Sequence, residues 1–526
     1  MIGDVKLLTA ARIRALDKRA IHEIGIPGVV LMEQAGRGAV QIIEAAGWLS
    51  SRDDEVLLFA GKGNNGGDAL VVARVLMLAG FRRVKVALLA GCDAIGGDAK
   101  VNLDAFIRLG GQVEELLDEA CWHGLKATLQ TCKLLVDGLL GTGLNSDVRG
   151  LYAEIIAAIN QFSGPVLALD IPSGLHADSG LPLGNAVKAT ATATFAFAKP
   201  GLFVYPGREY SGRVEVVDIG IPRSWVDEEA AAAQLLTADF CRPLLPPSPM
   251  VNGHKGNRGH LLTFAGGPGK AGAGLLAAGA ALHCGCGLST LALPARVSAH
   301  LEGRNPALML EALPQSAEGQ IMSPTVADLE KLCSGKTALA VGPGLGLHKK
   351  AGELVAGLLR DCCLPMVLDA DALTLLAAAP EIMPKGRRQT ILTPHPGEMA
   401  RLLKCKSSEV QNDRLAAARK LALQWGVHIV LKGAGTVIAA PDGSFSINDS
   451  GNYLLSTAGS GDLLTGIIGS FLAQGLASLA AAQTGVFLHG LVADRLLAAG
   501  VSHGVTAVEL GRALPETLSQ LALGDI

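Results

Sequence analysis

The sequence lacks an excess of charge of either sign. Its 526 residues include 45 basic and 48 acidic side chains, for a formal net charge of -3. A protein that binds nucleic acid or an anionic membrane surface through long-range electrostatics normally carries a basic excess. The composition therefore argues against both kinds of partner. We expect small molecules as ligands, with no nucleic acid and no membrane bound.

Cysteine-based metal motifs are also missing. The ten cysteines include no pair of CxxC motifs with the spacing of a zinc site. We therefore expect reduced thiols in the core.

The first twenty residues carry seven charged side chains and no apolar run. We therefore expect no secretory signal and a cytoplasmic location.

Two long stretches, 271–295 and 463–493, contain no Asp, Glu, Lys or Arg. Glycines interrupt both of them, at Gly285 in the first and at Gly475 in the second. Each stretch is therefore more typical of buried elements in a soluble protein than of one membrane-spanning helix.

What is present is a repeated alternation of short apolar runs and helical patterns, as expected for βαβ units. The runs are apolar at successive positions, which is typical of strands buried on both faces of a parallel sheet. We predict an α/β fold with a Rossmann-like, doubly wound sheet in the first half and a second α/β domain after it. The strands are predicted at 55–61, 84–91, 133–138 and 165–170, and then at 260–267, 338–344, 365–371, 389–398 and 427–433.

A proline-rich segment separates the two halves. Four prolines occur among the seven residues from Pro243 to Pro249, and proline disrupts helices and central strands. We predict an N-terminal domain of residues 1–225, a linker of residues 226–250 and a C-terminal domain of residues 251–526.

The segment GKGNNGGD, from Gly61 to Asp68, follows the first predicted strand and contains four glycines. Uncovered backbone amides and two asparagine side chains can wrap phosphate or ribose. The structural alternative is a tight turn with Asp68 as a helix N-cap. Two later strands end in Asp137 and Asp170, and ligands of open α/β sheets bind beyond the carboxyl ends of strands. The three segments are therefore expected to meet at one site.

The motifs NNGGD, VDGLLGTGL and LDIPSG, in this order, resemble the NAD(P)H-hydrate epimerase family over roughly residues 10–220. The resemblance implies that Asp170 is the acid-base residue beside the C6 hydroxyl of the hydrated ring. This hydroxyl can leave the ring and return on either face. It implies a potassium ion held by oxygens of Asn65, Asp137 and Ser173. The implied hydrate-binding residues are Asn64, Asn65, Gly66, Gly67, Asp68, Gly141, Thr142, Gly143, Leu144, Asn145, Ser146, Asp147 and Asp170.

In the second half, the sharpest feature is TAGSGD, from Thr457 to Asp462, which leads into an apolar helix. A glycine turn at a helix start offers backbone amides and the helix dipole to an anion. A lone aspartate at such a position is usually only a cap. The glycines on either side, Gly459 and Gly461, favour a functional role for Asp462.

The GSGD element resembles the anion hole and catalytic aspartate of the ribokinase-like superfamily. With HKGNRGHLL, VGPGLG, TPHPGE and LKGAGT in order over about residues 240–520, the half is similar to the NAD(P)H-hydrate dehydratase family. One departure is Ala307, where that family usually has glutamate. The resemblance implies Asp462 as the catalytic base. The implied hydrate contacts are Ala273, Gly346, His395 and Asp462, and the implied nucleotide contacts are Lys432, Gly433, Ala434, Gly435, Thr436 and Gly461.

The two resemblances together imply metabolite repair of hydrated NADH and NADPH. The N-terminal half would interconvert the R and S hydrates. The C-terminal half would dehydrate the S hydrate by phosphorylating its C6 hydroxyl and losing phosphate, with magnesium accompanying the nucleotide phosphates. The two halves are fused in one chain in the bacterial style, and this resemblance favours ADP over ATP as phosphoryl donor. The motifs themselves fit both nucleotides. Ala-rich helices predict a homo-oligomer.

Three alternatives stay open at this point. The segment from Gly267 to Gly272 matches the GxGxxG of a Rossmann oxidoreductase, but the ribose-binding acid expected about twenty residues later is missing. A small-molecule kinase of the vitamin-precursor type would share GSGD and leave the first half unexplained. A non-catalytic binding scaffold with degenerate sites is disfavoured because Asp170 and Asp462 are both present.

Overall fold

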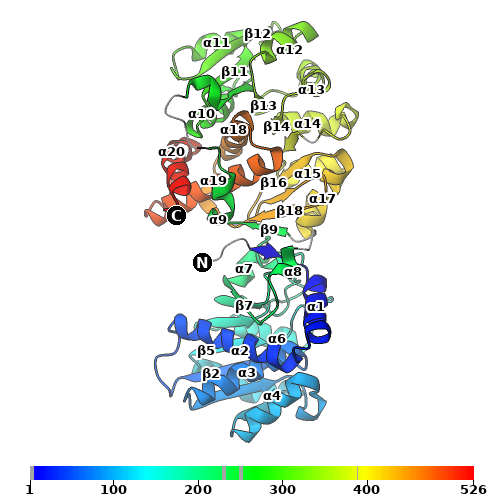
Figure 1. Ribbon diagram of the computed structural model, residues 1–526, viewed down its shortest axis with the longest axis vertical. Helices are drawn as coiled ribbons and strands as arrows, with labels where there is room; N and C mark the ends of the chain where they lie inside the picture. The colour runs from blue at the N-terminus through cyan, green and yellow to red at the C-terminus, as the bar shows by residue number, and fades with distance from the viewer. Residues whose placement is uncertain (1–4, 228–232, 248–252, 388, 526) are drawn as a thin grey trace. The chain divides into compact units, whose positions relative to one another are not determined.

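The computed structural model describes residues 5–227, 233–247, 253–387 and 389–525. These residues form two compact units, one of Lys6–Ala233 and one of Gln234 onward that also includes Val5 (Figure 1). Each unit is an α/β structure with its own sheet and its own apolar clusters. The predicted α/β fold class is therefore confirmed for both halves of the chain.

A seven-stranded sheet forms the centre of the N-terminal unit, in the order β4-β3-β2-β5-β6-β7-β8. Every neighbouring pair is parallel. The order reverses between β2 and β5, as in doubly wound folds. The strands are β2 (Glu55–Ala60), β3 (Arg83–Leu88), β4 (Gln112–Glu115), β5 (Leu134–Gly138), β6 (Val166–Leu169), β7 (Ala191–Phe195) and β8 (Arg213–Val217).

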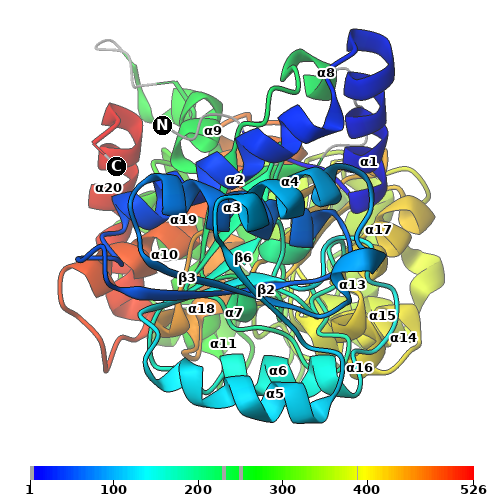
Figure 2. The ribbon, with the colours of Figure 1, turned by 90° about the horizontal axis from the view of Figure 1, so that it is seen from below.

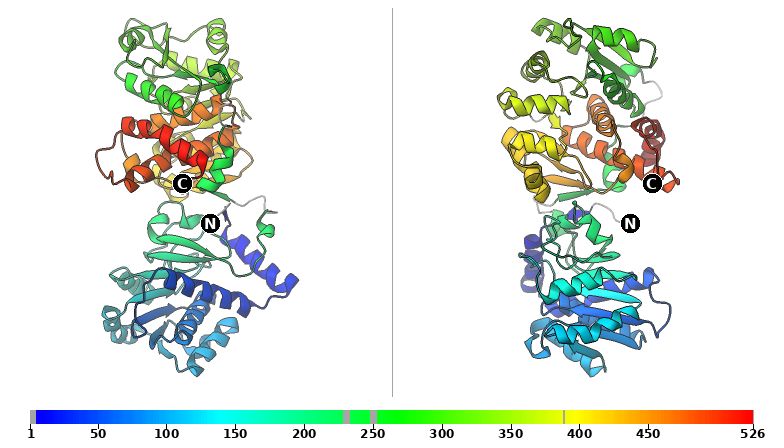
Figure 3. Two further views of the ribbon diagram at one scale, coloured as in Figure 1. Left: turned by 60° about the vertical axis from the view of Figure 1, so that its left-hand side comes forward. Right: turned by 180° about the vertical axis from the view of Figure 1, so that it is seen from behind.

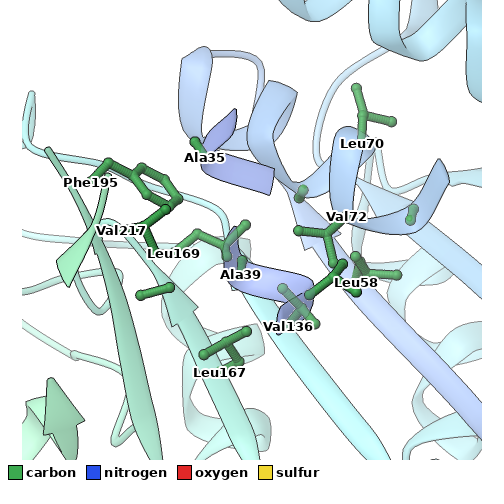
Figure 4. Close-up of a cluster of buried hydrophobic side chains, with 14 of the residues drawn as sticks. Ala35, Ala39, Leu58, Leu70, Val72, Val136, Leu167, Leu169, Phe195 and Val217 are labelled. Atoms are coloured by element: carbon green, nitrogen blue, oxygen red, sulfur yellow. The ribbon is translucent and has the colours of Figure 1, made fainter. Parts of the chain in front are cut away.

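Helices cover both faces of this sheet because successive apolar residues of each strand point to opposite faces. In β2, Leu58 packs with α2, α3 and α4, whereas Leu57 and Phe59 pack with α5 and α6 (Figure 2). Figure 4 shows Leu58 in the first cluster, close to Val72 of α3. The helices are α1 (Ala10–Arg19), α2 (Gly28–Ala45), α3 (Asn64–Leu78), α4 (Gly97–Arg108), α5 (Glu119–Lys126), α6 (Leu151–Ile159), α7 (Arg208–Ser211) and α8 (Ser224–Asp227).

The C-terminal unit has a mixed sheet in the order β9-β18-β17-β16-β15-β14-β13-β10-β11-β12. Neighbours are parallel except at β17, which is antiparallel to both β16 and β18. The strands are β9 (Ala233–Leu236), β10 (His260–Phe264), β11 (Leu288–Pro294), β12 (Met309–Leu313), β13 (Ala338–Val341), β14 (Met366–Leu368), β15 (Thr390–Leu392), β16 (His428–Leu431), β17 (Val437–Ala439) and β18 (Phe445–Asn448).

Two groups of helices flank this second sheet. In Figures 1 and 3, α18, α19 and α20 lie on one side of it and α13, α14, α15 and α17 on the other. The helices are α9 (Ala238–Cys241), α10 (Ala271–His283), α11 (Ala295–Leu301), α12 (Val326–Cys333), α13 (Lys349–Asp361), α14 (Asp371–Ala378), α15 (Pro396–Leu403), α16 (Ser407–Asn412), α17 (Arg414–Trp425), α18 (Ser460–Ala473), α19 (Ser478–Ala498) and α20 (Ala507–Leu523).

The two charge-free stretches become separate buried elements, as expected. The first forms α10 and β11, and the second forms α18 and α19 with a break at Gly475. Helices α10 and α18 pack closely, since a Cβ atom on Gly466 would come within 2.0 Å of the carbonyl oxygen of Ala277. Among the described residues, no helix combines the length and apolar character needed to cross a membrane.

The segment predicted as a linker, 226–250, contains regular structure. Strand β9 pairs with β18, so residues 234–236 belong to the C-terminal sheet. Helix α9 follows, with Thr237 as its N-cap. Residues 228–232 and 248–250 of this segment lie outside the described residues. The linker prediction rested on the prolines, and these mark only the part of the segment after α9.

Candidate active sites

The carboxyl ends of β2, β5 and β6 open into a cavity of about 630 Å³. The strand order reverses between β2 and β5, so the loops after them run to opposite faces of the sheet and leave a crevice. NNGGD is the first turn of α3 and not a loop, because α3 begins at Asn64 and Asp68 lies inside it. The cavity wall includes these predicted hydrate-binding residues: Asn64, Asn65, Asp68, Gly141, Thr142, Gly143, Leu144 and Asp170.

The other predicted hydrate-binding residues lie around this wall. A Cβ atom on Gly66 would come within 1.8 Å of the carbonyl oxygen of Gly61, and one on Gly67 would come within 2.7 Å of the Met32 side chain. These glycines therefore let α3 approach the end of β2 and helix α2. Residues 145–147 are exposed and follow the wall in the chain. Contact of Asn145, Ser146 and Asp147 with a hydrate stays a prediction.

The three side chains predicted to hold potassium lie together. Buried Asp137 accepts hydrogen bonds from Ser173 Oγ at 2.5 Å and from Ser173 N at 2.8 Å. Ser173 Oγ and Asn65 Nδ2 both donate to the carbonyl oxygen of Leu140, at 3.2 Å and 3.0 Å. Asn65 Oδ1 is buried with no hydrogen-bond partner among the described residues. Burial raises the pKa of Asp137 to about 6. An unsatisfied amide oxygen and a buried carboxyl group fit a cation with a preference for oxygen ligands.

Asp170 follows β6 with a φ of 63°, a conformation that residues with a side chain rarely adopt. Its carboxylate forms an ion pair with the Nζ of Lys199, whose side chain is fully buried. Lys199 also donates to Thr194 Oγ1 at 2.9 Å and to Phe195 O at 3.2 Å. A buried ammonium group needs such partners to offset its desolvation. The pair fixes the side chain of Asp170 at the cavity wall.

Sequence reasoning missed Lys199 and Asp17. Asp17, on α1, lines the cavity together with Asp68. Burial, followed by the charge of Asp170, raises the pKa of Asp17 to about 6, and burial raises the pKa of Asp68 well above its ordinary range. The available signal for Lys199 was a single cation within the apolar run FAFAKPG. Asp17 lies in a charged helix and carried no comparable signal.

In the C-terminal unit, a charged cluster forms at the carboxyl ends of β14, β15 and β16. Lys432 Nζ lies 2.6 Å from Asp369 Oδ1 and 3.9 Å from Glu398 Oε2. Thr465 Oγ1, on α18, donates to Asp369 Oδ2 at 2.8 Å. Asp462 lies in the first turn of α18, and its pKa is raised to about 6 by burial and then by the charge of Asp369. The sequence analysis identified Lys432 and Asp462, but it did not identify Asp369 and Glu398, the two acidic residues near Lys432.

The predicted nucleotide-binding residues are also close together. Residues 432–436 connect β16 to β17, and Gly433 and Gly435 have positive φ values of 141° and 61°. Gly433 and Ala434 are exposed, and Thr436 Oγ1 donates to Gly433 O at 2.9 Å. A Cβ atom on Gly461 would lie 3.4 Å from Lys432 Nζ, so the GSGD turn faces this loop.

The remaining predicted hydrate contacts surround the same edge of the sheet. Gly346 N donates to Asp371 Oδ2 at 2.8 Å, and Asp371 also pairs with Lys270 at 3.1 Å. A Cβ atom on Gly344 would lie 3.4 Å from the Ala273 side chain. His395 is the N-cap of α15, where its Nδ1 accepts from Gly397 N at 3.0 Å. Ala307, the departure from the family pattern, lies in an exposed turn before β12.

Comparisons with known proteins match both halves. Residues 261–516 match the NAD(P)H-hydrate dehydratase family, and residues 28–201 match the family of the YjeF-related protein N-terminus. A bifunctional NAD(P)H-hydrate repair enzyme of Moorella thermoacetica is 42% identical over 98% of this chain and 97% of that protein. The chain belongs to the family of bifunctional NAD(P)H-hydrate repair enzymes. The Escherichia coli member is 35% identical over 95% of this chain and 91% of its own length.

A solved relative covers the C-terminal half. The ADP/ATP-dependent NAD(P)H-hydrate dehydratase of Bacillus subtilis, crystallised with ATP and Mg²⁺, is 30% identical, with a TM-score of 0.46 over 55% of this chain and 98% of that chain. The two family models and the full-length relatives confirm the predicted family of bifunctional repair enzymes. The oxidoreductase alternative loses its basis, since GPGKAG joins β10 to α10 inside the dehydratase match.

Proposed function

We propose that this repair enzyme acts on hydrated NADH and NADPH in two steps at two separate sites. The N-terminal cavity interconverts the R and S hydrates, and the Lys432–Asp462 cluster dehydrates the S hydrate. The observation that carries the proposal is the cavity at the carboxyl ends of β2, β5 and β6, whose lining combines residues of NNGGD and GLLGTGL with Asp170. That position in a doubly wound sheet is where dinucleotides bind.

In the first step, Asp170 transfers a proton at the C6 hydroxyl of the hydrate. Its pairing with Lys199 fixes the position of the carboxylate at the end of β6. A positioned carboxylate is suited to act as a general base toward a water or hydroxyl proton. The first turn of α3, with Asn64 and Asn65 on the cavity wall, offers backbone amides to the phosphate groups of a dinucleotide.

Potassium is the cation that we propose for Asn65, Asp137 and Ser173. The unsatisfied Asn65 Oδ1 and the buried Asp137 are the observations that support a cation there. When bound, the ion would supply positive charge that offsets the buried carboxylate of Asp137 and would fix the start of α3 relative to β5. No step of the epimerisation requires the ion to touch the reacting hydroxyl.

In the second step, Asp462 removes the proton of the C6 hydroxyl as that oxygen attacks the terminal phosphoryl group of the nucleotide. Phosphate then leaves from C6 with the bonding electron pair while the lone pair of the ring nitrogen forms a C=N⁺ bond. Loss of a proton from C5 to water then restores the C5=C6 double bond and returns the lone pair to nitrogen. Lys432 and the amides of the GSGD turn stabilise charge on the transferred group, which is the main catalytic task in phosphoryl transfer. The loop at Lys432–Thr436 holds the nucleotide, with ADP as the proposed donor and ATP as the alternative.

Magnesium would accompany the nucleotide. Among the described residues, no group of three or more His, Cys, Asp or Glu side chains could hold a metal ion alone. Mg²⁺ usually takes one or two carboxylates and completes its ligands with phosphates and water. Glu398, beside Lys432, fits that role. Bound there, Mg²⁺ would supply charge neutralisation for the phosphates.

The decisive experiment incubates the full chain with mixed R and S NADH hydrate, Mg²⁺, K⁺ and either ADP or ATP, and follows NADH by its absorbance. We expect complete recovery of NADH with at least one donor. Asp462→Ala should keep R/S interconversion and lose dehydration, whereas recovery with Asp170→Ala should stop near the initial S fraction. Asp525→Ala, an exposed carboxylate change, is the matched control.

The outcome that contradicts the proposal is loss of both activities in a folded single variant, or recovery of NADH without nucleotide. Repeating the reaction with NADPH hydrate tests whether both cofactors are repaired. Assembly into a homo-oligomer stays a prediction, and size-exclusion chromatography with light scattering tests it.

A further inference from the structure

The epimerase cavity contains more carboxyl groups than one acid-base residue requires. Asp17 of α1, Asp68 of α3 and Asp170 after β6 all line it. Asp170 is paired with Lys199. Asp17, by contrast, has no hydrogen-bond or ion-pair partner among the described residues, although it is not fully exposed. A half-buried carboxyl group without a structural partner, on the wall of a cavity, is a candidate for chemistry.

The charges around Asp17 favour its protonated form. The three acidic side chains face one buried ammonium group, and the donors of Lys199 are already directed to Asp170, Thr194 and Phe195. Arg14 lies one turn before Asp17 on α1, is exposed, and donates to Thr142 O at 3.2 Å. Lys62 and Asp98 are the other charged residues of the cavity wall. Burial and the charge of Asp170 together hold the pKa of Asp17 above its usual range, at about 6.

Asp17 and Asp68 differ in how accessible they are to a molecule bound in the cavity. Asp68 is buried within α3, at 7% exposure, whereas Asp17 is more exposed and lies on a different helix from the NNGGD turn. The cavity therefore presents a carboxylate paired with Lys199 from the end of β6 and a separate, unpaired carboxyl group from α1. Two carboxyl groups in different environments are the arrangement used for paired acid and base catalysis.

We propose that Asp17 donates the proton to the departing C6 hydroxyl of the hydrate, while Asp170 accepts the proton from the entering water. This inference rests on the assignment of the cavity to the hydrate made above. Asp17 thus becomes a second catalytic residue of the epimerase step, contributed by the first helix of the unit.

The step balances without an added reactant. The proton of Asp17 goes to the C6 oxygen, the C6–O bond breaks with its electron pair on oxygen, and water leaves. The lone pair of the ring nitrogen forms a C=N⁺ bond to C6. Water then adds to C6 on the other face, the C=N⁺ electron pair returns to nitrogen, and Asp170 takes the excess proton. The proton returns from Asp170 to Asp17 through cavity water.

The test compares Asp17→Asn, Asp17→Glu and the wild-type full chain in R-to-S conversion without nucleotide, so that dehydration cannot run. For Asp17→Asn we expect kcat to fall about 100-fold or more with KM within about threefold of wild type. Asp17→Glu should retain about a tenth or more of the rate, because it restores a carboxyl group. Asp104→Asn, on α4 and outside the cavity wall, removes a pairing with Lys100 at 3.0 Å and is the control, which should match wild type.

Two results would overturn the role of Asp17: a kcat within about threefold of wild type in Asp17→Asn, or a loss confined to KM. The wild-type pH profile gives a check that needs no variant. Because the acid form is required, kcat should fall as pH rises above about 6, and a flat profile from about pH 5 to about pH 8 would also overturn it. If Asp170→Ala keeps full activity, the assignment of the cavity itself fails, whatever Asp17 does.

Discussion

Lys432 and Asp369 form a buried ion pair, with 2.6 Å between Nζ and Oδ1, across the end of β15. Asp369 follows β14 and Lys432 follows β16, so the pair fixes two strand ends relative to each other. The second carboxylate oxygen of Asp369 accepts from Thr465 of α18. One carboxylate therefore positions both the nucleotide loop and the helix that carries Asp462.

The first prediction concerns this carboxylate. Asp369→Asn removes the charge partner of Lys432, whose ammonium group is then left with Glu398 at 3.9 Å. Misplacement of a phosphate-binding cation by about 1 Å costs about 100-fold in rate. We expect dehydration to slow by about that factor while R/S interconversion stays unchanged. Asp361→Asn, on α13 and paired only with its neighbour Arg360, is the control. Wild-type dehydration by Asp369→Asn would contradict the role.

The second prediction is the pH dependence of dehydration. Burial and the charge of Asp369 raise the pKa of Asp462 to about 6. A base acts in its ionised form, so kcat should rise as pH increases through about 6 and then level off. Asp369→Asn removes a like charge and should move the midpoint to lower pH. An unmoved midpoint, measured at saturating hydrate and nucleotide, would show that another group limits the reaction.

The sequence predicted the parts of the fold that depend on local patterns. Apolar runs located β2, β5 and β6, and motif order located the GSGD turn and the strand-end aspartates. Strand β9 escaped prediction because its partner β18 is about 210 residues away in the chain, and no local pattern encodes that pairing. The alternative in which Asp68 is a helix N-cap placed the start of α3 too late, since glycines usually weaken helices. Here tertiary packing against Gly61 and Met32 requires them.

Residues that act through charge were the least predictable part of the sites. Asp17, Lys199 and Asp369 are single ionisable residues with no spacing signal of their own. Their importance comes from burial and from neighbours contributed by other elements, such as Asp170 for Lys199. Coulomb interactions at a site depend on the folded geometry. Motifs could therefore identify Asp170 and Asp462 but not the charged residues that contact or surround them.

The third prediction concerns the cation at Asn65. Replacing K⁺ by choline should lower the melting temperature of the N-terminal unit and slow R/S interconversion, because Asn65 Oδ1 and Asp137 lose a shared partner. At about 100 times its Kd, a bound ion stabilises the folded state by about 2.7 kcal/mol. Asp137→Asn should remove the difference between the two cations. Differential scanning calorimetry in matched ionic strength measures both effects, and equal melting temperatures for wild type would rule out the site.

The last prediction concerns the closest backbone contact in the epimerase site. A Cβ atom on Gly66 would lie 1.8 Å from the backbone oxygen of Gly61, and neither group can rotate away. Gly66→Ala must therefore shift the start of α3 away from β2, at a cost of about 1–3 kcal/mol in the free energy of unfolding. R/S interconversion should be lost while dehydration continues.

The control is Gly124→Ala in helix α5, where a Cβ atom would meet nothing within 4 Å. This variant should leave activity intact and stabilise the unit by up to about 1 kcal/mol. Urea unfolding monitored by circular dichroism separates the two variants. Equal stability of Gly66→Ala and wild type would mean that α3 does not depend on this contact.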